Sequence, residues 1–383
     1  MWVLSIKQYH KIIISAFLII IFLISISIVI LFPKNIKNID AKLNFNRDNA
    51  HEYIEDQLDI GYRIPGTSES RECVNYFISK FQHINENFTY IIQNFEVHST
   101  NCQNVLFKLN EDEKNIVILG AHYDSRAKAT KAGSDRPIPG ANDGASGCAV
   151  LLELADVLYD KRDDLDCQIW FAFFDAEDQG KDEGGYGIKD WDWIEGSEEF
   201  VDNLEYLHDS DSEDFECMIL LDMVGGKNLR FIKEEHSTTP LLEELFEIGR
   251  QLGYLNEFPL FPESNSVLDD HLPFLQEGIP SADLVINFWN NPDWPHHHTK
   301  KDDLSHISKK SLEITGKTIE QFIYNNYLDP NKHDYQGNSP WDEDEGSPYI
   351  ELILIIITMT IIISSIAIVY IYRKRNSMKT HDD

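Results

Sequence analysis

Two stretches of the chain are apolar without interruption and are long enough to cross a lipid bilayer. Residues 12–32 carry no charged side chain and would span about 30 Å as a helix, at ~1.5 Å per residue. No small-residue cleavage site follows this run, so we expect an anchor that stays attached rather than a signal peptide. A second apolar run precedes a basic C-terminal tail. We therefore predict two transmembrane helices, at 12–32 and 349–372.

The charges that flank the second run indicate which side of a membrane each end would face. The stretch 329–348 before it is acidic and the tail 373–383 after it is basic, so the positive-inside rule places the C-terminus in the cytoplasm. Lysines flank the first run on both sides and indicate no direction. With two spans we expect a membrane location, a cytoplasmic N-terminus at 1–11, and a folded domain at 33–328 outside the cytoplasm, followed by an acidic linker at 329–348.

Between the two runs the hydrophobic pattern changes from helical to alternating, and then to a repeated strand, loop and helix. Residues 49–84 read as opening helices around the turn Gly61-Tyr-Arg-Ile-Pro-Gly66, and residues 90–97 and 102–109 alternate as antiparallel strands do. Four apolar strands are then expected at 116–119, 167–174, 217–221 and 282–288, and helices at 145–159, 198–207, 239–252 and 308–327. This alternation predicts a single α/β domain with a mostly parallel, mixed central sheet flanked by helices.

The charge of the chain excludes one class of function. A formal net charge of −32 lacks the basic surface that nucleic-acid binding requires, so we expect no nucleic-acid partner. An acidic surface is usually only well solvated, but it also attracts cationic substrates such as peptides with a free amino terminus.

The cysteines and one sequon fit an extracytoplasmic domain. There are five cysteines and none forms a Cys-x-x-Cys pair, so a thiolate zinc site is not expected. Outside the cell we expect a disulfide between Cys73 and Cys102, both of which lie outside the strands that carry candidate chemistry. Asn87-Phe88-Thr89 is a short glycosylation sequon.

Acidic and imidazole side chains follow each predicted strand, where ligands of a parallel sheet bind. His122 and Asp124 follow the strand 116–119 and, being two residues apart on an extended chain, point to the same side. The remaining candidates are Asp143 in the small-residue loop 140–147, Glu177 and Asp178 after the strand 167–174, Asp222 after the strand 217–221, and the histidines 296–298.

Each of these groups has an ordinary explanation when it is taken alone. The loop around Asp143 could simply cap a helix, and three adjacent histidines often lie on a surface without a role. Acids packed at the end of an apolar strand, however, repel one another and resist burial unless a cation is present. Together the residues form a nitrogen and oxygen ligand set without sulfur, which suits one or two divalent ions and favours zinc.

These motifs, in this order, resemble those of the co-catalytic zinc aminopeptidases. The matching segments are His-Tyr-Asp-Ser, Ala-Asn-Asp-Gly-Ala-Ser-Gly, Phe-Asp-Ala-Glu-Asp, Leu-Asp-Met-Val-Gly, Asp-Asp-His-Leu-Pro-Phe and His-Thr-Lys-Lys-Asp. The resemblance covers about Asp56 to Tyr327. The same superfamily includes aminopeptidase Y-type peptidases, glutaminyl cyclases, the glutamate carboxypeptidase of membranes and the transferrin receptor, and it implies a zinc-exopeptidase-like fold.

The resemblance also implies a role for each candidate residue. One zinc ion would be held by His122 and Asp222 and a second by Asp178 and His298, with Asp143 bridging the two. Glu177 would be the general base that takes a proton from the attacking water, and Asp124 would orient His122. Asp270 and His271 match a pair near the family's pocket, and Asp302 would support His298. Asp178 departs from the pattern, because many members have glutamate there.

Three functions are compatible with this resemblance. The complete ligand set favours a membrane-anchored aminopeptidase that hydrolyses N-terminal residues from peptides with two zinc ions. The segment Asp269-Asp270-His271 and the tryptophans at 191 and 193 resemble instead the glutaminyl cyclases, which hold a single zinc, but those have a tryptophan where this chain has His297. A non-catalytic binding domain is the third alternative, although such relatives have lost ligands that are kept here. The sequence leaves the oligomeric state open.

Overall fold

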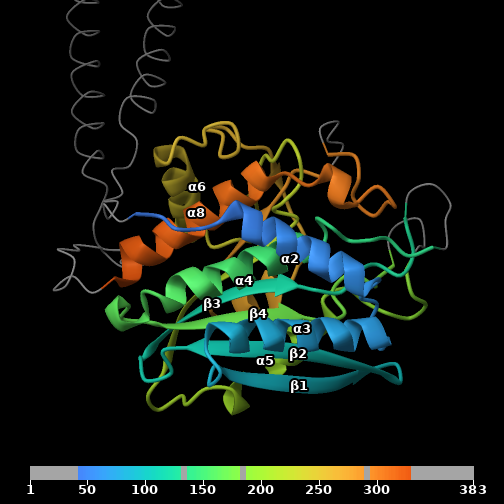
Figure 1. Cartoon of the computed structure of the whole chain (residues 1–383), viewed down its shortest axis with the longest axis horizontal. Helices are drawn as coiled ribbons and strands as arrows, with labels where there is room; N and C mark the ends of the chain where they lie inside the picture. The colour runs from blue at the N-terminus through green and yellow to red at the C-terminus, as the bar shows by residue number, and fades with distance from the viewer. Residues whose placement is uncertain (1–41, 131–135, 182–186, 289–293, 329–383) are drawn as a thin grey trace, which may run out of the picture. The chain divides into compact units, whose positions relative to one another are not determined.

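The structure is a computed structural model that describes residues 42–130, 136–181, 187–288 and 294–328 (Figure 1). The two predicted membrane spans, the acidic linker and both predicted cytoplasmic ends lie outside these ranges. Within them, no helix is both long and apolar enough to cross a membrane.

A six-stranded mixed sheet forms the centre of the described domain, in the order β1-β2-β4-β3-β5-β8. The strands are β1 (Thr89–Val97), β2 (Thr100–Leu109), β3 (Asn115–His122), β4 (Gln168–Phe174), β5 (Asp214–Asp222) and β8 (Ser281–Val285). Strands β3, β4, β5 and β8 pair in parallel, whereas β2 pairs antiparallel with both β1 and β4. The predicted α/β class and mostly parallel mixed sheet are therefore confirmed.

The strands that carry the site extend further than their apolar runs indicated. β3 was expected to end at Leu119, but it continues to His122, which pairs with Phe174 of β4. β5 likewise includes Asp222, which pairs with Val285 of β8. The ladder of hydrogen bonds between neighbouring strands, rather than hydrophobicity, sets these ends, so both candidate ligands are held by the sheet itself.

Helices cover both faces of the sheet. The longer ones are α2 (Arg47–Ile60), α3 (Ser68–Ile84), α4 (Ala145–Tyr159), α6 (Thr239–Gln251) and α8 (Lys309–Tyr327), and they pack together on one face. The shorter α5 (Glu195–Asp202) and α7 (His271–Gln276) cover the other. The short elements are η1 (Arg162–Asp164), η2 (Leu204–Tyr206), η3 (Leu304–His306), β6 (Lys233–Glu234) and β7 (Ser264–Asn265).

One predicted helix is wrong in its extent. A single helix was expected at 198–207, but α5 begins at Glu195 and ends at Asp202, and the separate turn η2 follows it. The break lies at Asn203, whose side-chain amide donates to the carbonyl and the carboxylate of Glu199. Such local side-chain bonds compete with the helical pattern and favour a helix end.

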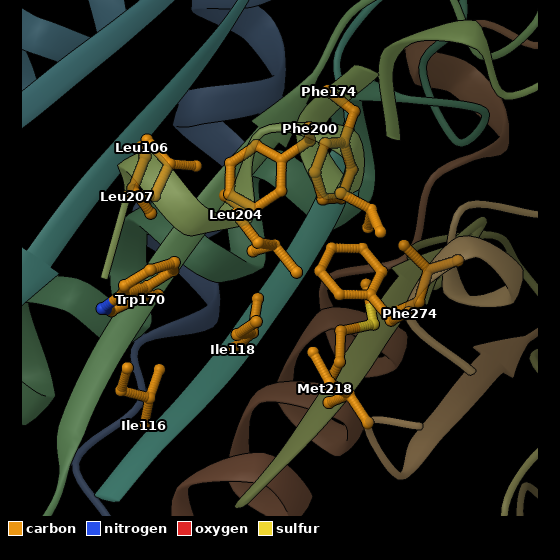
Figure 2. Packing of buried hydrophobic residues seen from close by; sticks show 14 residues of the cluster. Leu106, Ile116, Ile118, Trp170, Phe174, Phe200, Leu204, Leu207, Met218 and Phe274 are labelled. Atoms are coloured by element: carbon orange, nitrogen blue, oxygen red, sulfur yellow. The ribbon is translucent and has the colours of Figure 1, made fainter. Parts of the chain in front are cut away.

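Alternate side chains of the central strands build an apolar core beneath α5 and α7 (Figure 2). Ile116 and Ile118 of β3, with Trp170 and Phe174 of β4, point toward this face, as the two-residue period of a strand requires. Phe200 of α5 and Phe274 of α7, among others, close the cluster from the helix side. This packing fixes the two parallel strands whose ends carry the candidate site.

The expected disulfide is absent from the described residues. Cys73 and Cys102 are both buried and free, as are the other three cysteines. Cys102 packs in an apolar cluster with Phe95, Val97 and Trp191, whereas Cys73 lies in α3 against the rest of the core. The two thiols therefore serve separate packing contacts. Asn87 is exposed in the turn before β1, where the predicted glycosylation stays a prediction.

Candidate active site

The candidate residues converge at the carboxyl ends of β3, β4 and β5. His122 and Asp222 are the last residues of their strands, and Glu177 and Asp178 follow β4. Asp143 lies in the turn that enters α4, and His298 comes from a turn before α8. Because the carboxyl ends of parallel strands meet at one edge of the sheet, residues far apart in sequence reach one place.

His122 lies at the centre of a first group of carboxylates. Its Nε2 atom is 3.1 Å from Asp222 Oδ1 and 3.4 Å from Asp143 Oδ1, and its Nδ1 atom is 3.3 Å from Asp124 Oδ1. Burial alone would lower the pKa of His122, but the three surrounding carboxylates raise it well above 6.5. The ring therefore has a carboxylate partner on each nitrogen.

His298 forms a second group with the other oxygen of Asp143. Its Nε2 atom is 3.0 Å from Asp178 Oδ1 and 3.7 Å from Asp143 Oδ2. His297 lies beside it, with ring centroids 3.6 Å apart, and Asp143, His297 and His298 together could also hold an ion. Asp143 thus turns one oxygen toward each group, as a bridging residue would.

The donor atoms of this site fit a zinc ion. Asp143 Oδ2 and Asp178 Oδ2 are buried and have no hydrogen-bond partner among the described residues. A buried carboxylate oxygen without a partner is costly, and a cation removes that cost. His122, Asp143 and Asp222 form a further cluster with ligand spacing. Carboxylate oxygens and imidazole nitrogens without sulfur are suitable zinc ligands.

Asp124 connects the end of β3 to the turn after β4. Besides contacting His122, it accepts hydrogen bonds from the backbone amides of Glu177 and Asp178 and from the side chain of Gln179, at 3.1, 3.2 and 2.7 Å. Burial would raise its pKa, but these bonds and His122 hold the pKa below 3.8. The carboxylate is therefore charged, and it orients His122 together with the two acids after β4, as a carboxylate behind a metal ligand does.

Glu177 is buried among other acids. Its carboxylate lies 3.8 Å from His122 Nδ1. Burial raises its pKa well above 4.5; His122 opposes this rise, and the nearby Asp269, Asp178 and Asp270 add to it. A carboxyl with a raised pKa can both accept and return a proton near neutral pH. Asp269 is the neighbour that the sequence-based site lacked, although it adjoins Asp270 in the same motif.

Asp270 and His271 are both buried, each with its own partner. Asp270 accepts a 2.5 Å hydrogen bond from Ser197 Oγ, which ties the start of α7 to α5. His271 Nε2 lies 3.1 Å from Glu234 Oε2 of β6. Asp270 lies near enough to Glu177 to help raise its pKa, whereas the contact of His271 is with Glu234.

Three further residues support Asp178 and His298, and none of them was assigned to the site from the sequence. Arg126 is fully buried and donates to the carboxylate of Asp178 at 3.0 Å. Thr130 Oγ1 lies 3.2 Å from His298 Nδ1. The Trp193 ring stacks on His298 at an interplanar angle of 8° and also covers the Arg126 guanidinium, which lies 4.7 Å from the ring centroid. The tryptophan was noted only as a resemblance, and a buried arginine has no local sequence signal.

Asp302 contacts a different segment from the one that was expected. Its two carboxylate oxygens accept hydrogen bonds from the backbone amides of Asn142 and Asp143, at 2.8 and 3.0 Å. It therefore holds the loop that carries Asp143, whereas support of His298 was the expectation.

With this geometry established, comparison with known proteins identifies the family. Residues 104–323, more than half of the 383-residue chain, match the profile of Peptidase family M28. The chain belongs to this family. M28 enzymes depend on zinc and include both peptidases and glutaminyl cyclases.

Similar proteins in this M28 family carry both activities in their names. Aminopeptidase YwaD of Bacillus subtilis is 30% identical over 224 residues, which cover 56% of this chain but only 42% of YwaD. Glutaminyl-peptide cyclotransferase of Bos taurus is 25% identical over 292 residues, 68% of this chain and 77% of the bovine protein.

Solved structures show the same division. The glutaminyl cyclase of Bacteroides thetaiotaomicron superimposes with a TM-score of 0.66 at 30% identity, over 75% of this chain and 100% of the cyclase. A zinc-dependent exopeptidase from Parabacteroides distasonis gives the same TM-score and coverage at 29% identity. Similarity therefore supports the fold and zinc dependence, and the choice of reaction rests on the site.

Proposed function

We propose that this protein is a zinc-dependent enzyme that acts on the amino-terminal residue of peptides, and that its reaction is the cyclisation of N-terminal glutamine with release of ammonia. The observation that carries this choice is the distribution of unpartnered oxygens. Both buried ligand oxygens that lack a partner among the described residues, Asp143 Oδ2 and Asp178 Oδ2, belong to the group that includes His298.

The group around His122 is satisfied without a second ion. Both ring nitrogens of His122 have carboxylate partners within 3.4 Å, so the ring makes its contacts without a second ion. This arrangement supports one zinc position, at Asp143, Asp178 and His298. The sequence alone ranked two ions and peptide hydrolysis first, whereas a single ion is what the resemblance implies for a cyclase.

The side chains at the site supply the proton transfers that cyclisation needs. The α-amino nitrogen attacks the side-chain carboxamide carbon, and Glu177 takes the proton that this nitrogen loses. Glu177 then returns the proton to the carboxamide nitrogen, whose bond to carbon breaks as ammonia leaves. Burial, with Asp269 and Asp270 nearby, raises the pKa of Glu177, which lets this side chain hold the proton between the two transfers. A zinc ion bound here would polarise the carboxamide carbonyl as a Lewis acid.

Hydrolysis of the N-terminal residue with two ions is the second candidate. His122 Nε2 lies 3.1 Å from Asp222 Oδ1 and 3.4 Å from Asp143 Oδ1, and this spacing also suits three ligands around a shared ion. The oxygens of Asp143 would then bridge two ions, as in two-metal sites. The same side chains would serve, with Glu177 taking its proton from water.

One experiment separates the two reactions. The purified full-length chain is analysed for zinc content and incubated with peptides that begin with glutamine or with leucine, and the products are identified by mass spectrometry. We expect one zinc per chain and a glutamine peptide that loses ammonia and keeps all its residues. Glu177→Gln should lower the rate about 10³-fold, within the usual range for general acid–base groups, and leave the zinc content unchanged. Two zinc ions and a shortened peptide would replace our proposal by the second candidate.

We also propose that the domain is anchored by the spans at 12–32 and 349–372 and faces away from the cytoplasm. The support is the length and apolar character of both runs and the basic tail at 373–383. A glycan at Asn87 in eukaryotic expression, removable by a glycosidase, would test the orientation. In sealed vesicles whose cytoplasmic face is outside, an unmodified Asn87 together with termini that are protected from protease would contradict it.

A further inference from the structure

Arg63, from the turn between α2 and α3, is completely buried and binds only backbone oxygens in its observed hydrogen bonds. Its Nε atom donates to the carbonyl of Tyr123 at 3.0 Å, and Nη2 donates to that of Gly140 at 2.7 Å. Nη1 donates to the carbonyls of Pro139 and Gly61, at 3.0 and 3.3 Å. The carbonyl of Arg63 itself accepts from Ser125 at 3.2 Å. One side chain therefore joins the end of β3 to the loop that carries Asp143.

Asp302 binds the same loop through groups of the opposite polarity. Its carboxylate accepts from the amides of Asn142 and Asp143, and its backbone carbonyl accepts from the amide of Ala141 at 3.3 Å. The loop 139–143 therefore turns two carbonyls toward a buried cation and three amides toward Asp302. Asp302 also closes the turn that follows His298, because its amide donates to the carbonyl of Thr299.

The loop 139–143 has a backbone shape that depends on its contacts with Arg63 and Asp302. Gly140 has a φ of +64°, and a Cβ atom there would lie 2.6 Å from the carbonyl oxygen of Asp143 and 3.0 Å from Arg63 Nη2. Burying a cation among carbonyls, and an anion among amides, is costly compared with apolar packing. The three segments that the two residues join carry His122, Asp143 and His298, which are three of the five candidate ligands. A role in ligand geometry accounts for the position of both charges.

We propose that Arg63 and Asp302 act as one clamp that positions Asp143 for zinc binding. This inference rests on the proposed zinc site. Neither residue touches the ion or the substrate, so each is a positioning residue that acts through Asp143. Partners of this kind behind a metal ligand typically change metal affinity by about 10–100-fold when they are removed.

The test measures zinc affinity of the full-length chain by competition with a chromogenic chelator. The variants are Arg63→Gln, Asp302→Asn and the double variant, with Arg63→Lys as a milder change that keeps the positive charge. Arg71→Gln is the matched control, because Arg71 also donates to a backbone carbonyl, that of Gly66, but is exposed. Circular dichroism and the melting temperature report whether each variant is folded.

We expect Arg63→Gln and Asp302→Asn each to weaken zinc binding about 10–100-fold. The zinc affinity of the double variant should be no lower than that of the single variant with the lower affinity, because both residues hold the same loop. Arg63→Lys should recover part of the affinity, and Arg71→Gln should bind as the wild type does. Excess zinc should restore the activity of the Arg63→Gln variant, which a loss of folded protein would not allow.

Two results would overturn the inference. Unchanged zinc affinity in Arg63→Gln and Asp302→Asn, with a lower melting temperature, would make the two residues determinants of stability alone. Losses that multiply in the double variant would show that they act independently. A wild-type chain that binds no zinc would instead refute the proposed function, so the two failures are distinguishable.

Discussion

Arg126 supports Asp178, a candidate zinc ligand, and replacing Arg126 should have different consequences with and without zinc. Arg126 is fully buried and donates to the Asp178 carboxylate at 3.0 Å, to the Asp178 carbonyl at 2.8 Å and to the Gly180 carbonyl at 3.0 Å. Arg126→Met keeps much of the apolar stem and removes the cation. Without zinc, the Asp178 carboxylate would then be buried beside His298 with less compensating charge.

The size of the effect follows from the cost of breaking a buried ion pair. Removing one partner of such a pair typically destabilises a protein by about 3–5 kcal/mol. For a domain of this size about 2 °C of melting temperature corresponds to 1 kcal/mol, so the zinc-free variant should melt roughly 6–10 °C lower. A bound cation would compensate the charge of Asp178, so the loss should be clearly smaller in the presence of zinc. Zinc should therefore raise the melting temperature of the variant by more than that of the wild type.

Differential scanning calorimetry in chelator and in saturating zinc measures this difference directly. Wild type, Arg126→Met and Arg126→Lys are compared, with Arg71→Met as the exposed control. An equal loss of melting temperature in both conditions would refute the reasoning, since it would mean that zinc does not compensate the charge of Asp178. A loss in the Arg71 variant would show that the effect does not depend on burial.

Two further predictions concern the packing of α4. Burial raises the pKa of Glu153, on α4, to about 7, which is above the unfolded value near 4.5. The contribution of Glu153 to stability is therefore complete below about pH 4.5 and is lost as the pH rises to 7. The loss is about 3 kcal/mol, at 1.36 kcal/mol per pKa unit. In urea unfolding, the free energy of unfolding of Glu153→Gln should therefore decline less between pH 5 and pH 8 than that of the wild type. Gly147 packs so closely against β5 that an added Cβ would meet the Leu221 carbonyl oxygen at 2.0 Å. Gly147→Ala should lower the free energy of unfolding, measured in denaturant, by about 3 kcal/mol. It should also reduce activity, because Asp222 follows Leu221 in the chain. An unchanged unfolding free energy together with unchanged activity would contradict the close contact between Gly147 and β5.

The fold class and most of the candidate site follow from the sequence by local rules. Apolar strand runs alternating with helices require a parallel sheet, and a parallel sheet brings the residues after its strands to one edge. That is why His122, Asp178 and Asp222 could be placed together before any coordinates were known. The extent of β3 and the break at Asn203 could not, because backbone pairing and one side-chain bond decide them.

Only the tertiary structure decided which buried charges support the candidate ligands. Arg63 lies 77 residues from Gly140 in the chain, Arg126 lies 52 from Asp178, and Asp302 lies 159 from Asp143. No periodicity or motif spacing encodes such contacts, because they arise when the ends of separate strands and loops pack together. The sequence determines an edge of an α/β sheet that is lined with carboxylates and imidazoles, and the packing decides which oxygens there have a hydrogen-bond partner among the described residues and which do not.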